Sequence, residues 1–114
     1  MLKKLERIVE AIESKKGEEL VILDFEGKNS LCDYAVICTG SSNRNIRAIS
    51  EEVEAELLRL NERRLSVEGQ EDAHWILIDG DDVMIHVLDQ ETRDLYRLEE
   101  LWGDANVVYP RLNG

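Results

Sequence analysis

Apolar positions in the first forty residues follow a helical spacing and then a strand spacing. In the opening segment they recur three and four residues apart, which predicts an amphipathic helix ending near Gly17. Residues 19–25 are a short apolar run that predicts a strand, and residues 26–30 predict a turn. Residues 33–40, DYAVICTG, are apolar at nearly every position, which is typical of a strand covered on both faces.

The remaining pattern contains a long helix, three short strands and a final helix. The long helix is predicted to begin after Gly40, where Ser41 or Ser42 can cap it. Residues 62–69 and 75–88 predict three strands, Asp89 caps a helix over residues 90–102, and residues 106–114 form an irregular tail. The order α-β-β-α-β-β-β-α predicts an α/β fold, a mixed β-sheet covered by helices, in one domain of residues 1–105.

Residues 75–88, WILIDGDDVMIHVL, predict a β-hairpin whose turn sets the register of its two strands. If Gly80 and Asp81 are a two-residue loop, glycine occupies the first position of a type II′ turn. The pairs expected to lie opposite each other are then Asp79 and Asp82, Ile78 and Val83, Leu77 and Met84, Ile76 and Ile85, and Trp75 and His86.

Because side chains alternate along a strand, this hairpin has two distinct faces. One face is β-branched and suited to a core: Ile76, Ile78, Val83, Ile85 and Val87. The other face is mixed: Trp75, Leu77, Asp79, Asp82, Met84 and His86. The mixed face is either covered by a helix or kept partly apolar for a partner. Two opposed aspartates are mutually unfavourable, which favours a cationic partner.

The charge balance narrows the classes of partner. Fourteen Lys and Arg stand against 25 Asp and Glu, a net charge of −11, and the chain has no compact basic run. Binding to nucleic acid through phosphates is therefore not expected, whereas a basic protein partner is attracted. The charge can equally serve solubility alone. No apolar run approaches the 18 or so residues needed to span a membrane, and we expect a cytoplasmic protein.

The carboxylates and histidine of the hairpin, together with the turn at Gly40 and Ser41, raise the possibility of chemistry. A Gly-Ser turn before a helix followed by strand carboxylates is the arrangement that holds Mg²⁺ and a nucleotide in nucleotidyltransferases. Here the acids that closely follow Ser41 lie inside the long helix, and the hairpin acids lie at a turn. We therefore expect no enzyme, no metal and no cofactor, with a residual nucleotide or Mg²⁺ site at Gly40-Ser41 as the alternative.

Three motifs together carry a resemblance that extends over nearly the whole chain from residue 24 to residue 105. DYAVICTGSSNRNIRAI, VEG and HWILIDGDDVMIHVLDQETRDLYRLEELWGDA resemble the ribosome silencing factor family, also called the Iojap family. The resemblance implies a nucleotidyltransferase-like fold without a working active site. It also implies a translational repressor that binds ribosomal protein fourteen of the large (50S-type) subunit. Such a protein sterically blocks joining of the small subunit and lowers translation when nutrients are limiting.

Carried onto this chain, the resemblance places the partner contact on Trp75, Asp79, Asp82 and His86. Three residues of the last helix are further candidates: Arg93, Tyr96 and Glu99. Each of these three also has a purely structural interpretation, as an ion pair within the helix or as cover for the sheet.

The chain departs from the family pattern at two positions. The hairpin glycine, Gly80, comes one place early, and Asn45 stands where the family often has Gln or His. Apart from these departures, an exposed sheet edge or one face of the last helix would also support a homodimer.

Overall fold

The computed structural model describes residues 3–101 and 106–109. Its elements, in chain order, are α1 (Lys3–Ser14), β1 (Glu18–Asp24), β2 (Tyr34–Thr39), α2 (Asn43–Arg59), β3 (Leu65–Glu68), β4 (Trp75–Gly80), β5 (Val83–Leu88), α3 (Gln90–Tyr96), α4 (Leu98–Leu101) and β6 (Asn106–Tyr109). The strands form one sheet in the order β3-β4-β5-β2-β1-β6. Strands β2 and β5 are parallel and the other neighbours are antiparallel, so the predicted mixed sheet is confirmed.

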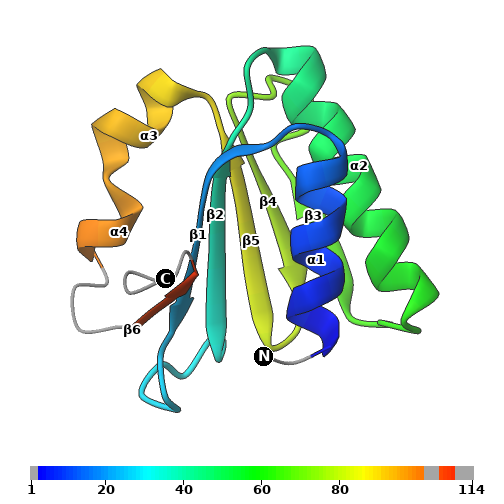
Figure 1. Ribbon diagram of the computed structural model, residues 1–114, viewed down its shortest axis with the longest axis vertical. Coiled ribbons are helices and arrows are strands. Elements are labelled where there is room, and N and C mark those ends of the chain that lie inside the picture. The colour runs from blue at the N-terminus through cyan, green and yellow to red at the C-terminus, as the bar shows by residue number, and fades with distance from the viewer. Residues whose placement is uncertain (1–2, 102–105, 110–114) are drawn as a thin grey trace.

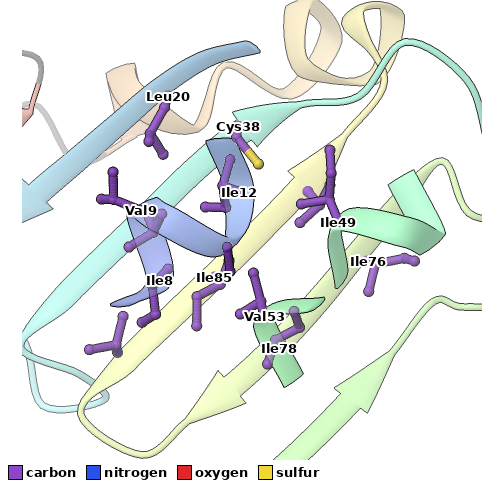
Figure 2. Packing of buried hydrophobic residues seen from close by; sticks show 14 of the residues in the cluster. Ile8, Val9, Ile12, Leu20, Cys38, Ile49, Val53, Ile76, Ile78 and Ile85 are labelled. Atoms are coloured by element: carbon purple, nitrogen blue, oxygen red, sulfur yellow. The ribbon is translucent and has the colours of Figure 1, made fainter. Parts of the chain in front are cut away.

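Helices cover both faces of the sheet, as Figure 1 shows, with α1 and α2 on one side and α3 and α4 on the other. The α1–α2 side holds the larger core, in which isoleucines of both helices meet isoleucines of β4 and β5 (Figure 2). A second, smaller cluster lies on the α3–α4 side, and its members include Leu23, Ile37 and Leu98. Strand β2 is buried along both faces, as its uninterrupted apolar sequence predicts.

The final helix is broken, where the sequence predicts one helix over residues 90–102. Arg97 ends α3 in the left-handed conformation, with φ 48°, and its N–H donates to the carbonyl of Arg93. The turn lets Leu98 pack into the smaller core, where it is almost fully buried. Burial of Leu98 offsets the cost of the left-handed arginine.

The prediction of an irregular tail over residues 106–114 is wrong for its first part. Asn106–Tyr109 form β6 and pair antiparallel with β1. The segment NVVY is rich in residues that favour strands, and β1 offers it an open row of backbone donors and acceptors. Residues 110–114 lie outside the described part of the chain.

The first turn of α1 is tied to the hairpin through Lys4. Its ammonium Nζ donates to Glu62 Oε2 at 2.7 Å, to the Gly80 carbonyl at 2.6 Å and to Asp82 Oδ1 at 2.6 Å. Burial is the largest single influence on the pKa of Lys4 and lowers it, but the hydrogen bonds and charges of Asp82 and Glu62 together raise it. Lys4 therefore remains a cation that joins three segments distant in sequence.

We expect Lys4→Met to lower the free energy of unfolding by about 1.5 kcal/mol, since it removes charge-assisted bonds from a partly buried site. Urea denaturation followed by circular dichroism measures this loss. Lys3→Met is the matched control, because Lys3 lies in the same turn and is exposed. Equal midpoints for the two variants would show that the three bonds contribute nothing.

Candidate functional site

The hairpin register differs from the predicted one by two residues. Trp75 lies opposite Leu88, Leu77 opposite His86 and Asp79 opposite Met84. The two-residue loop between the strands is thus Asp81-Asp82 and not Gly80-Asp81. Gly80 stays in β4 because it pairs with Leu65 of β3, and a Cβ there would stand 3.3 Å from both Leu57 and the Val83 carbonyl.

Aspartates supply the turn that glycine was predicted to make. Asp81 adopts a positive φ of 73°, a region that aspartate tolerates better than most residues. Asp79 Oδ1 accepts a hydrogen bond from the Asp81 N–H at 3.0 Å, and Asp82 is held by Lys4. The predicted opposition of Asp79 and Asp82 is therefore wrong, and Asp82 bonds toward α1 instead of lying on the mixed face.

Apart from Asp82, the predicted division of the hairpin into two faces is confirmed, because a shift of two residues leaves the alternation along each strand unchanged. The face toward α1 and α2 is fully buried: Ile76, Ile78, Val83, Ile85 and Val87. On the other face, four side chains are half-buried, and we call these four residues the hairpin face: Trp75, Leu77, Asp79 and Met84. This surface is partly apolar and open, with one carboxylate in it.

Trp75 is held by contacts with two aromatic side chains. Its indole Nε1–H donates to His86 Nδ1 at 3.1 Å, across the diagonal of the β4–β5 pair. The ring of Tyr96 from α3 lies 5.0 Å from the indole, centroid to centroid, and Tyr96 is 55% exposed. Tyr96 thus extends the hairpin face onto α3.

The loop before β4 closes against the backbone of Trp75. Gly69 directly follows β3 and has φ 88°, and a Cβ at this position would lie 2.2 Å from the Trp75 carbonyl oxygen. Only glycine satisfies both conditions. The motif VEG therefore ends in a turn that supports the backbone of Trp75.

Two predicted contact residues lie inside the domain. His86 is 5% exposed, and burial lowers its pKa to about 4, so the imidazole is neutral at physiological pH. Arg93 is 6% exposed, and its Nη1 donates to the Glu19 carbonyl at 2.7 Å and to Thr39 Oγ1 at 2.9 Å. Arg93 thereby fixes α3 to β1 and β2. The side chain of Glu99 lies outside the described residues.

Two exposed leucines escaped the sequence interpretation. Leu95 is 74% exposed beside Tyr96 in α3, and Leu31 is 79% exposed in the β1–β2 turn. Leu31 precedes Cys32, which belongs to the same apolar cluster as Met84. Leu31 could have been found in the sequence, because it is a lone leucine in a polar turn. Leu95 could not, because its spacing in the helix is that of a core residue.

The turn before α2 uses its polar groups internally. Ser42 Oγ accepts from the Asn45 N–H at 3.0 Å, and Asn45 Oδ1 accepts from the Ser41 N–H at 2.9 Å. Asn45 Nδ2 in turn donates to the Lys15 carbonyl at 2.9 Å. Asn45 therefore has a structural role, and the N–H groups of Gly40 and Ser41 are both engaged within the chain, to the Leu88 carbonyl and to Asn45.

The hairpin acids do not converge on a common point. Asp79 bonds the turn backbone, Asp81 approaches Arg64 at 3.8 Å and Asp82 bonds Lys4. Within the described residues, no group of three or more His, Cys, Asp or Glu side chains is placed to hold a metal ion.

No helix in the described part of the chain has the length and apolarity to cross a membrane.

Comparisons with known proteins agree on one family. The family described as "Ribosomal silencing factor during starvation" matches residues 1–113. The "Ribosomal silencing factor RsfS" of Halalkalibacterium halodurans is 38% identical over 104 residues, which cover 91% of this chain and 89% of that protein. A mouse protein named "Mitochondrial assembly of ribosomal large subunit protein 1" is 25% identical, over 86% of this chain and 44% of its own length.

Structural comparison gives the same result. A crystal structure of a protein from Chromobacterium violaceum superimposes with a TM-score of 0.85 at 34% identity, covering 89% of this chain and 84% of that one. The sequence and the fold thus agree over most of the chain. The chain belongs to the ribosomal silencing factor family.

Proposed function

We propose that this protein represses translation by binding the large ribosomal subunit at its ribosomal protein fourteen, through the hairpin face and Tyr96. Occupation of that surface would prevent the small subunit from joining and lower translation under nutrient limitation. The observation that carries the proposal is the half-buried, partly apolar hairpin face. Its aromatic residue, Trp75, is held in place by a hydrogen bond to His86. Family membership and the name of the mouse relative, which refers to assembly of the large ribosomal subunit, support a large-subunit partner.

The composition of this surface suits a basic protein partner. Trp75, Leu77, Met84 and Tyr96 supply apolar area, and aromatic residues and methionine are enriched at protein interfaces. Asp79 on the hairpin face and exposed Glu68 on β3 supply negative charge next to this area. A net charge of −11 adds long-range attraction toward a basic ribosomal protein. The mechanism is steric and requires no catalysis.

The test is sedimentation of the purified protein with separated ribosomal subunits. We expect it to pellet with the large subunit and to be absent from the small-subunit pellet. Light scattering after mixing the two subunits should then show that joining is inhibited in proportion to occupancy of the large subunit. Retention on the small subunit alone, or unimpaired joining at full occupancy, would refute the proposal.

Charge reversal tests the electrostatic part of the interface. We expect Asp79→Lys to weaken large-subunit binding about tenfold at low salt, with a smaller effect at high salt because screening shortens the range of the interaction. Glu10→Lys is the matched control, since it changes the net charge equally at an exposed position of α1 on the opposite side of the sheet. If both variants lose the same affinity, only net charge matters. Tighter binding by Asp79→Lys would exclude a basic partner surface.

A further inference from the structure

We propose that His86 is a positioning residue, which sets the orientation of Trp75 through its Nδ1 and does not touch the partner. The inference rests on the proposed function, because it concerns how the same surface is prepared for binding. It replaces the expectation, carried over from the family resemblance, that His86 is a contact residue.

The position of His86 in the sheet keeps it from the surface. It lies in the middle of β5, opposite Leu77 of β4 on one side and Ile37 of β2 on the other. Only 5% of the residue is exposed. A partner docked on the hairpin face would therefore meet Trp75 and Leu77, with the imidazole behind them.

The hydrogen bond defines what His86 does for the indole. An indole N–H is a donor only, and a half-buried one that lacks an acceptor is unfavourable. His86 Nδ1 accepts it at 3.1 Å, which requires a neutral imidazole with its proton on Nε2. Burial favours this neutral form. The bond fixes which way the indole N–H points, and hence which edge of Trp75 faces outward.

Two contacts from different elements then restrict the Trp75 side chain. The imidazole of β5 lies 5.9 Å from the indole, tilted by 46°, and the Tyr96 ring of α3 lies 5.0 Å away, tilted by 51°. A side chain already restricted in the free protein loses less conformational entropy on binding, so the complex is tighter. His86 thus increases the affinity for the partner by restricting the Trp75 side chain before binding.

Two amide substitutions separate positioning from simple packing. In His86→Asn the amide oxygen can occupy the place of Nδ1, because both atoms are two bonds from Cβ. In His86→Gln the oxygen lies one atom farther out, nearer the place of Nε2. We expect His86→Asn to bind the large subunit within about threefold of the wild type and His86→Gln to lose about tenfold.

The spectroscopic readout is the indole ¹H–¹⁵N resonance of Trp75, assigned by its disappearance in Trp75→Phe. In the free protein it should be slow to exchange with solvent in the wild type and in His86→Asn, and fast in His86→Gln. Equal binding by His86→Gln and the wild type, or slow exchange in His86→Gln, would overturn the proposal. So would tenfold weaker binding by a His86→Asn variant whose indole N–H still exchanges slowly.

A measurement on the unaltered protein guards against variants that fail to fold. The ¹⁵N shifts of the His86 ring should show Nδ1 as the unprotonated nitrogen and Nε2 as the protonated one. The reverse tautomer would overturn the proposal without any substitution. These signals are measured in the free protein and do not depend on the ribosome. An absence of large-subunit binding would therefore refute the proposed function, whereas the NMR signals would still decide whether His86 positions Trp75.

Discussion

Trp75→Ala is expected to weaken binding to the large ribosomal subunit at least about thirtyfold, which corresponds to about 2 kcal/mol. Trp75 lies in the hairpin face, is fixed by His86 and Tyr96, and presents the largest ring of that surface. Interface energy concentrates on such aromatic anchors, and truncation removes both their buried area and their fit to the partner. Co-sedimentation with a range of large-subunit concentrations gives the dissociation constant directly.

The matched control is Leu58→Ala, a truncation of another exposed apolar side chain. Leu58 is 57% exposed on α2, which covers the opposite face of the sheet. It should leave the dissociation constant unchanged. Because Trp75 also packs against the smaller core, unfolding of the alanine variant must be measured as well. A folded Trp75→Ala protein that binds like the wild type would remove Trp75 from the interface.

The faces of the hairpin could be predicted from sequence although its register could not. Alternation has a period of two, so the observed shift of two residues moves every pair and leaves each strand residue on its predicted face. The register depends on interactions that no local pattern contains. Gly80 is held by Leu65 of β3, and Asp82 is held by Lys4, 78 residues away in the chain.

Long-range packing also explains the other differences. The break at Arg97 depends on where Leu98 meets the sheet, and β6 depends on the free edge of β1. Arg93 looks like a surface residue of a polar helix until Glu19 and Thr39 are placed beside it. The nucleotidyltransferase-like comparison and the homodimer stay predictions. The family motifs and the two faces of the hairpin could be predicted from the sequence. Which residues are exposed for contact with a partner could be decided only once their neighbours in the folded protein were known.

Acidification from pH 6.5 to pH 4 is expected to remove about 3 kcal/mol of folding stability through His86 alone. Burial lowers the pKa of this residue from 6.5 to about 4, so in this window the unfolded chain binds a proton that the folded chain does not. Stability therefore rises with pH between these two values, at up to about 1.4 kcal/mol for each pH unit, and is fully present above pH 6.5.

His86→Asn isolates this contribution, because asparagine can keep the acceptor for Trp75 and does not titrate. The two proteins differ at residue 86 alone, so the pH dependence that they share cancels in the difference. Urea denaturation at half-unit pH steps should show the wild type losing about 3 kcal/mol more than His86→Asn between pH 6.5 and pH 4. Parallel curves would mean that the pKa of His86 is the same in the folded and the unfolded protein, so that the folded protein carries a protonated His86 within this pH window, and a protonated Nδ1 cannot accept the indole N–H. The same titration therefore tests the state of the histidine on which the orientation of Trp75 depends.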